Sequence, residues 1–455
     1  MDPTSKRCRI DAADRLSDLP DCLLHIIISS LGSRQAVQTS VLSRRWRHLW
    51  RDVPCAVVDE EEFVGDQWER FEDFADRLLT SIPAETRLDA FRLNLLSGGS
   101  VGYTCGFITS DRWIRRGLSR FPAVVDIRAA PGCSVRWRPH HSYSYASAQA
   151  PDPELDLSAT GLCAAGFTQR LRTLRLVGVN LTGGFVEDFG RHCPAIEELH
   201  VERCLVGKLG AIASPTLRSL VIVESGRSLR CVHFRITAPR LACLRLEIPY
   251  NGENCYCGGP EATTEPKPLA SLAEASIRLT DTSRLWERNQ RARKKRKLEF
   301  LKSMRSFLAL LPNVTKLHLT GFTTTALLEE ESQEFPELHG LKYLLLEECD
   351  VGLKFQALTS ILQNTTNLEK LGLRRCTFLA RPAKKRQVMG RQQPSKGRSS
   401  MLPVSWCKNL ESIEIEGRQE DAPRVPEVLL MVSKGMDLEQ WGRVKKSVTF
   451  VPRTD

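Results

Sequence analysis

Residue types that can do chemistry are scattered along this chain, and few stand at the spacing that chemistry requires. Cys255 and Cys257 form a close pair, but no second pair or nearby histidine completes a four-ligand zinc site. His140 and His141 lie in a segment rich in Ser and Tyr, without a pattern of carboxylates around them. The glycine-rich LSGGSVGYTCG at 96–106 lacks the spacing of a phosphate-binding loop. We therefore predict surface loops at these positions, with no metal and no cofactor.

Catalytic motifs are missing from the sequence as well. No G-x-S-x-G, H-E-x-x-H, P-loop or G-x-G-x-x-G pattern follows a segment with strand character. The sequence therefore predicts a protein that is not an enzyme.

Positive charge is concentrated in two runs. The chain has a net charge of +11, yet six positive charges lie within 291–297 and seven within 381–398, and without these thirteen the net charge is −2. Neither run contains an aromatic residue, so nucleic-acid binding is not expected. Two alternatives remain for the first run, a nuclear-import signal and a solvated helix face. The residues concerned are Arg293, Lys294, Lys295, Arg296 and Lys297.

The N-terminal segment 15–51 predicts two or three short amphipathic helices. Pro20 and Asp21 suit the start of the first helix, and Gly32 ends it. About 40 residues lie near the lower limit for independent folding, so we expect neighbours or a partner to cover part of the apolar surface. The apolar stripes are Leu23, Ile26, Ile27 and Leu31, then Ala36, Val37, Val41 and Leu42, then Trp46, Leu49 and Trp50.

This segment resembles the F-box of plant proteins, through DRLSDLP at 14–20 and TSVLSRRWRHLW at 39–50. In that family the module binds the Skp-type adaptor of a cullin-based ubiquitin ligase. Three positions depart from the usual pattern, because Cys22, Ser30 and Gly32 stand where an acidic residue, Phe and Pro are common. The resemblance implies that the residues facing the adaptor are Leu19, Pro20, Leu23, Ile26, Val41, Leu42, Ser43 and Trp46.

From about residue 85 the chain repeats an L-x-x-L-x-L unit. Several start-to-start intervals lie between 21 and 27 residues, the range of leucine-rich repeats. Alternate apolar residues in L-x-L place one face of a short strand in a core that only a neighbouring repeat can complete. The units begin at Leu88, Leu171, Ile196, Leu217, Leu241, Val314, Leu341, Leu368 and Leu410, with weaker copies at Val124 and Leu272.

Two regularities flank the repeat unit. Proline often stands two residues before it, where it ends the preceding helix, and cysteine follows at Cys204, Cys349 and Cys376. We interpret these cysteines as structural, because a small buried polar side chain there can satisfy backbone groups of a turn. Helical spacing of apolar residues predicts helices from Trp68, Phe185, Leu298 and Phe355.

The predicted fold is α/β, with an N-terminal three-helix F-box followed by a leucine-rich-repeat solenoid, a curved and mostly parallel sheet with outer helices and turns. Over nearly its whole length the sequence resembles plant F-box proteins with leucine-rich repeats. LESIEIEGRQEDAPRVPEVLL partly resembles the FBD region of such proteins. The expected organisation is a polar tail (1–14), the F-box (15–54), a linker and helix (55–84), repeats (85–420) with basic insertions near 284–297 and 381–400, and a C-terminal segment (421–455).

The residue between the two apolar positions of L-x-L points away from the core, so the strands should display one such residue each. As a hypothesis, this row binds acidic groups of a protein substrate, because guanidinium groups pair with carboxylates or phosphates. A solvated sheet surface is the alternative. The row holds Arg92, Arg175, His200, Arg245 and His318, then Leu345, Gly372 and Glu414.

Function follows from the resemblance and the repeats together. The leading hypothesis is a substrate-recognition subunit of a cullin-based ligase, with the F-box on the adaptor and the repeats on an unknown protein substrate. The alternative is a repeat scaffold that binds a protein or small ligand without directing degradation. An odd number of cysteines, fifteen, together with no run of 18 apolar residues and no secretory signal predicts a soluble protein of the nucleus or cytoplasm, without a membrane partner.

Overall fold

The computed structural model describes residues 19–65, 68–96, 105–130, 136–137, 169–181, 193–206, 211–223, 235–250, 268–281, 304–321, 336–349, 351, 355–377 and 407–451. The chain divides into two compact units. The first comprises Met1–Arg136 and Ser142–Leu171, and the second Trp137–His141 and Arg172–Asp455.

The first unit begins with short helices, as the apolar stripes predict. They are α1 (Asp21–Ser29), α2 (Ser33–Gln38), the 3₁₀ turn η1 (Thr39–Val41), α3 (Trp46–Leu49) and η2 (Trp50–Asp52). Pro20 precedes α1 in an extended conformation, and Gly32 does the same before α2. The core between them consists of Leu24, Ile28, Ala36, Trp46, Leu49 and Val53.

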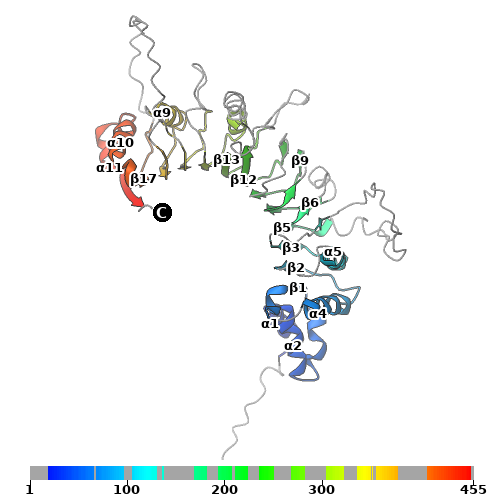
Figure 1. Cartoon of the computed structure of the whole chain (residues 1–455). Helices are drawn as coiled ribbons and strands as arrows, with labels where there is room; N and C mark the ends of the chain where they lie inside the picture. The colour runs from blue at the N-terminus through cyan, green and yellow to red at the C-terminus, as the bar shows by residue number, and fades with distance from the viewer. Residues whose placement is uncertain are drawn as a thin grey trace, which may run out of the picture. The chain divides into compact units, whose positions relative to one another are not determined.

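Three parallel strands follow, β1 (Cys55–Asp59), β2 (Ala90–Leu95) and β3 (Val124–Ala129), with η3 (Glu60–Phe63), α4 (Trp68–Ser81) and α5 (Cys105–Leu118) between them. The predicted helix from Trp68 is confirmed, whereas β1 and α5 were not anticipated. Figure 1 shows α4 and α5 beside these strands. Aromatic rings pack between the helices. The centroid of the Phe71 ring lies 5.4 Å from that of Trp113 and 5.5 Å from that of Phe63.

Polar contacts connect α2 to β1 and η3, and we call this set of contacts the join. The backbone N–H of Val57 donates to Ser33 Oγ at 2.8 Å, and the N–H of Arg34 donates to Glu62 Oε2 at 3.0 Å. The Arg34 guanidinium lies over the Phe63 ring, 4.1 Å from its centroid. A Cβ at Gly32 would overlap the Glu62 carboxylate, so glycine there permits this contact. These contacts therefore hold the F-box-like helices in a fixed position against the first strand and η3.

The second unit carries a parallel sheet whose strands follow chain order. Each strand pairs in parallel with the next one along the chain. In order they are β5 (Thr173–Val177), β7 (Glu198–Glu202), β10 (Ser219–Val223), β12 (Cys243–Tyr250), β13 (Glu274–Asp281), β14 (Lys316–Thr320), β15 (Tyr343–Glu347), β16 (Lys370–Arg374), β17 (Ser412–Arg418) and β18 (Lys445–Val451).

Shorter elements flank this sheet. Two-residue strands β6 (Asn180–Leu181) and β8 (Leu205–Val206) pair with each other, as do β9 (Ala211–Ala213) and β11 (Arg235–Thr237), while β4 (Arg136–Trp137) contains residues of both units. The helices are α9 (Gln356–Gln363), η6 (Gln419–Arg424), α10 (Val425–Ser433) and α11 (Leu438–Arg443). α9 confirms the helix predicted from Phe355. Residues 304–308 are helical, as predicted for the helix from Leu298. The helix predicted from Phe185 falls on 185–193, and all but the last of these residues lie outside the described ranges.

Each L-x-x-L-x-L unit coincides with a strand, and its three apolar side chains are buried, as Leu341, Leu344 and Leu346 illustrate. The α/β architecture with a helical N-terminus and a large, mostly parallel repeat sheet is thus confirmed. The strands β1 and β18 extend the pattern beyond the units read from the sequence. Of the helices that the structure describes, none has both the length and the apolar character needed to cross a membrane.

The turn after the strand uses the predicted cysteines. The Sγ atoms of Cys204, Cys349 and Cys376 donate to the carbonyl of a leucine in the preceding repeat at 3.4, 3.4 and 3.3 Å. Burial raises the pKa of the Cys204 thiol to about 11, so it stays neutral and unreactive. The residue before each cysteine has a left-handed backbone, with φ between 50° and 53°. The structure supports a structural role for these thiols.

Candidate functional surfaces

Large apolar side chains are exposed on α1 and around η1. Leu23 and Ile26 of α1, Val41 of η1 and Leu42 after it are between 43% and 84% exposed. Large aliphatic side chains exposed together on so small a helical unit mark a surface for another protein. Pro20 is exposed beside them, whereas Leu19 is half-buried and packs against the core.

Trp46 lies beneath this surface and not on it. Its side chain is only 5% exposed and belongs to the core with Leu24 and Ile28. Ser43 is half-buried, and its Oγ has no hydrogen-bond partner among the described residues. The structure therefore divides the eight residues suggested by the resemblance into an exposed set and a set that is buried or half-buried; the second set is Leu19, Ser43 and Trp46.

Arg45 fixes the first helix against the third. Its guanidinium donates to Asp21 Oδ1 from Nε at 3.0 Å and from Nη2 at 2.5 Å, and to the Leu19 carbonyl at 2.5 Å. Charge-assisted hydrogen bonds of this kind are stronger than neutral ones. The start of α1, where the exposed apolar side chains begin, is held in a defined position.

A second candidate surface is the face of the second unit's sheet that points away from the leucine core. Arg175 pairs in register with His200, and His200 with Val221, Arg245, Ser276 and His318 in turn across consecutive strands. The predicted row is therefore real, although Val221 and Ser276 interrupt it. Arg92 stands at the corresponding position of β2, in the first unit.

Glutamates two residues further along the strands engage most of this row. His200 Nε2 lies 3.0 Å from Glu202 Oε2, and Arg175 Nη2 lies 4.0 Å from the same oxygen. The hydrogen bond from His200, aided by the charges of Arg203 and Arg175, lowers the pKa of Glu202. The positive charge around β5 and β7 is therefore partly neutralised within the chain itself.

His318 has a similar partner. Its Nε2 lies 3.0 Å from Glu347 Oε2 and 3.1 Å from Thr320 Oγ1. Burial lowers the pKa of His318, against the opposing attraction of Glu347. Arg278, on the strand before, places Nη2 3.6 Å from Glu347 Oε2. Sequence reasoning missed these glutamates: strand alternation places them on the same face as the row, but the pairing of Glu347 with His318 depends on the register between β14 and β15.

Arg245 differs from Arg175, His200 and His318, the other basic residues of the row in the second unit. It is exposed, and within the described parts of the chain it has no ion-pair partner. Further along the row Leu345 is buried, lying over the space where Gly372 has no side chain, and Glu414 is exposed. Among the described residues of this sheet, Arg245 therefore offers an exposed guanidinium that no carboxylate among them pairs with.

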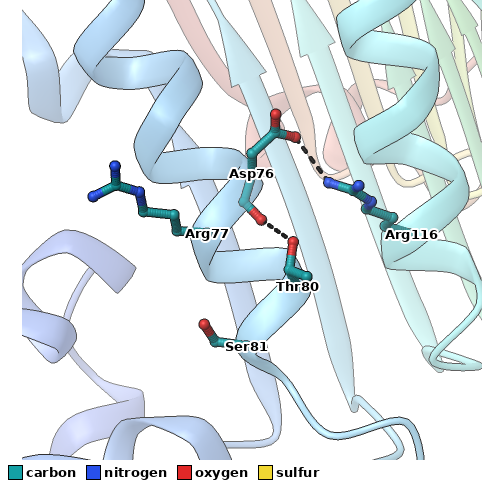
Figure 2. A pocket seen from close by; sticks show the side chains of 5 residues that line it. All are labelled: Asp76, Arg77, Thr80, Ser81 and Arg116. Carbon is teal, nitrogen blue, oxygen red and sulfur yellow. Dashed lines mark hydrogen bonds and ion pairs between the residues drawn. The ribbon is translucent and has the colours of Figure 1, made fainter.

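An open pocket of about 380 Å³ lies beside α4 and α5. It is lined by Asp76, Arg77, Thr80, Ser81 and Arg116, whose side chains are drawn in Figure 2. Asp76 accepts hydrogen bonds from Arg116 Nη1 at 2.9 Å, Arg112 Nη2 at 2.6 Å and Trp113 Nε1 at 3.0 Å. Its carboxylate already has three donors, so it ties α5 to α4 and is a structural group.

Other candidates from the sequence fall outside the described ranges. They are the loops at 97–104, 140–141 and 255–257 and the basic runs at 291–297 and 381–398. Among the residues that are described, no group of three or more His, Cys, Asp or Glu side chains could hold a metal ion.

Comparison with known proteins gives the family. Residues 16–57 match the F-box domain. The meiotic F-box protein MOF of Oryza sativa subsp. japonica is 42% identical over 416 residues, which cover 89% of this chain and 80% of that protein. A putative F-box/LRR-repeat protein of Arabidopsis thaliana is 26% identical over 392 residues, 79% of this chain and 76% of its own. An F-box/FBD/LRR-repeat protein of the same plant is 29% identical over 248 residues, 53% of this chain and 57% of its own. With the helical F-box, the repeat sheet and these relatives in agreement, the chain belongs to the plant F-box proteins with leucine-rich repeats.

Proposed function

We propose that this protein is a substrate-recognition subunit of a cullin-based, SCF-type ubiquitin ligase. Members of the F-box family are generally non-catalytic adaptors, and the exposed apolar surface formed by Leu23, Ile26, Val41 and Leu42 is the observation that carries the proposal. The F-box binds the Skp-type adaptor, the repeats bind a protein substrate, and ubiquitin transfer takes place on partner subunits.

The exposed set makes the contact with the adaptor, and the buried set shapes it. Leu23, Ile26, Val41 and Leu42, bordered by Pro20, lose their solvent contact in the complex. Leu19, Ser43 and Trp46 act at the base of the same surface. A few fully desolvated side chains near the centre of an interface usually carry most of its binding energy.

A pair of matched valines tests this assignment. Val41→Asp places a charge on the exposed surface, and Val64→Asp makes the same change at a comparably exposed valine outside the F-box helices. We expect Val41→Asp to weaken binding of the purified adaptor by about 30-fold or more, a loss typical of interface hot spots. Val64→Asp should bind like the unchanged chain. Equal binding by all three proteins would contradict the proposed surface, and a failure of the unchanged chain to capture adaptor and cullin would favour a scaffold that does not direct degradation.

We further propose that the substrate presents acidic groups to the row that contains Arg175, His200, Arg245 and His318, and to Arg92 on β2. Arg245 supports this proposal best because its charge lacks a partner among the described residues. Guanidinium groups bind carboxylate and phosphate bidentately, which gives geometric selectivity as well as attraction.

Charge reversal separates this row from charge in general. Arg175→Glu combined with Arg245→Glu should weaken substrate capture, and so should Arg245→Glu alone. Arg240→Glu, at the exposed turn before β12, makes the same charge change as the single variant but off the row, and it should leave capture unchanged. Substrates can be sought first in cells undergoing meiosis, because the rice relative is named for that process. Unchanged capture by the double variant, with adaptor binding intact, would place the substrate elsewhere on the chain.

A further inference from the structure

The last strand of the second unit has an open edge. Within the described residues, β18 has a neighbour on one side only, β17. Figure 1 shows β18 in red as the final strand, after β17. An unpaired edge presents a row of backbone N–H and C=O groups, and it is a template for pairing with another strand.

The register identifies the backbone groups that are open. The N–H of Lys445 donates to the Glu411 carbonyl at 2.9 Å, and Lys445 pairs in register with Ser412. In a parallel ladder the groups that face the partner strand alternate along the chain. The backbone groups of Lys445, Ser447 and Thr449 therefore face β17, and those of Lys446, Val448 and Phe450 face outward.

This edge lacks most of the devices that keep natural strands apart. The segment KKSVTFV contains no proline or glycine, and Val448 and Phe450 are 38% and 42% exposed. Lysine is a common guard of such edges, but Lys446 turns back on its own chain. Its Nζ donates to the carbonyls of Trp441 at 2.6 Å and Val444 at 3.0 Å, and it lies 4.1 Å from the centroid of the Trp441 ring.

We propose that β18 pairs antiparallel with β18 of a second copy of this chain, about a two-fold axis at Val448. This register overlaps all seven residues of the strand. It places Lys446 opposite Phe450, Ser447 opposite Thr449 and Val448 opposite itself. The outward-facing groups of Lys446, Val448 and Phe450 all find partners.

Charge favours this register over its neighbours. Both lysines stand at the same end of the strand, so an antiparallel pair keeps the lysines of one copy away from those of the other. Pairing centred on Lys446 would instead set like charges opposite each other, which is unfavourable across strands. The cross-strand pairs of serine with threonine and of valine with valine are also compatible with an antiparallel sheet.

The consequence goes beyond substrate recognition by one chain. Two copies joined at β18 present two F-boxes and two repeat sheets in one particle. A substrate with two recognition segments would then bind with an avidity that exceeds the affinity of either sheet alone. A seven-residue strand pair is a small interface, and interfaces that bury less than about 1,200 Å² belong to transient complexes. The dimer should therefore depend on concentration.

Sedimentation of the purified 455-residue chain over a range of concentrations tests the proposal. We expect the average mass to rise toward that of two chains. Val448→Pro should keep the chain monomeric, because it removes an outward N–H and leaves the ladder with β17 intact. Val448→Lys should do the same by like-charge repulsion, whereas Val448→Thr should still dimerise.

Charge pairing gives the sharpest readout. Val448→Lys and Val448→Glu chains should each be monomeric alone and should form a mixed dimer when combined. Adaptor binding by all variants should equal that of the unchanged chain, so a failure here is distinguishable from a failure of the proposed function. A chain that stays monomeric at every concentration, or dimerises equally well with Val448→Pro, would overturn the pairing of β18 with itself.

Discussion

Trp46 shows how a single side chain can serve a surface without lying on it. It is buried in the core with Leu24 and Ile28 of α1, whereas Ile26 and Leu42 are exposed. Its removal therefore acts on folding first and on binding second. Substitution of the exposed aliphatic side chains should instead affect adaptor binding first and folding second.

Replacing Trp46 with Ala should lower the free energy of unfolding of the first unit by about 3–5 kcal/mol, as loss of a large buried aromatic usually does. Ile26→Asp, at an exposed position, should change it by less than about 0.5 kcal/mol. Urea unfolding of both variants measures the difference. Adaptor binding, measured where both variants are folded, should be lost for Ile26→Asp and partly kept for Trp46→Ala.

His318 should make the stability of the second unit depend on pH. Charged and polar groups around it come from four strands, with Arg278 on β13, Thr320 on its own strand, Glu347 on β15 and Arg374 on β16. Burial lowers the pKa of His318 below its ordinary value of 6.5. The unfolded state then binds more protons just below pH 6.5, so stability is complete above that pH and falls as the pH drops toward the folded pKa.

Urea unfolding of the unchanged chain and of His318→Gln, at about pH 5.5 and 7.5, checks this behaviour across the range in which histidine titrates. We expect the unchanged chain to lose more stability at the lower pH than the variant does. An equal loss in both proteins would mean that other groups control the acid response.

At the scale of elements, the join between α2 and the first strand governs the N-terminal unit. Burial raises the pKa of the Glu62 carboxyl, and the N–H of Arg34 opposes that shift by hydrogen bonding to the charged form. The carboxylate occupies the space that a side chain at position 32 would need. Gly32 and Glu62 should therefore behave as one unit.

Gly32→Ala should lower the free energy of unfolding by about 1–3 kcal/mol, because the new methyl group displaces Glu62. In a Glu62→Ala background the same change should have little effect. A double-mutant cycle by thermal or urea unfolding measures the coupling. Additive losses would show that Gly32 is needed for another reason. Hydrogen exchange at the Val57 amide should report the loosening directly.

The sequence predicts those elements in which apolar residues recur with the period of the strand or helix that they form. The leucines of L-x-x-L-x-L are buried by strand alternation, so β2, β3, β5, β7, β10 and β12 to β17 follow from spacing, whereas the short strands β4, β6, β8, β9 and β11 do not. β1 (CAVVD) and β18 (KKSVTFV) lack the leading leucine, because β1 takes its cover from α2 and η3 and β18 ends the described sheet. In α1 apolar residues occupy nearly every side, and periodicity could not tell that Leu24 and Ile28 face inward while Leu23 and Ile26 face outward. Partners in other strands, such as Glu347 for His318, depend on register, which spacing within one strand does not give.

On the scale of the whole molecule, net charge is a poor guide to partners. The excess of positive charge belongs to the runs at 291–297 and 381–398, and the sheet surface pairs its arginines and histidines with glutamates. Long-range attraction of nucleic acid would need a broad basic surface. Recognition by this chain therefore depends on local groups.

Neutralising Arg293, Lys294, Lys295 and Arg296 together should leave the melting temperature within about 1 °C, because we expect these charges to be solvated and solvated charges contribute little to stability. If the run directs nuclear import, as we propose, a fluorescent fusion of the variant should shift from the nucleus to the cytoplasm. A matched change at Lys384, Lys385 and Arg386 serves as the control. An unaltered distribution would leave this run as a solvated segment, and a large fall in melting temperature would show that it is built into the fold.

The join at Gly32 also bears on how such genes can evolve. Recombination often exchanges protein domains between genes as independent units, with the crossover at the boundary between two domains. Here the boundary near residue 54 is crossed by the bond from Val57 to Ser33 and by the contacts of Glu62 and Phe63 with Arg34. An F-box acquired from a relative with proline at position 32 would collide with the Glu62 carboxylate, so recombination at this boundary should yield a poorly folded hybrid. The first 63 residues should therefore be inherited as one piece, and position 32 should vary only together with position 62.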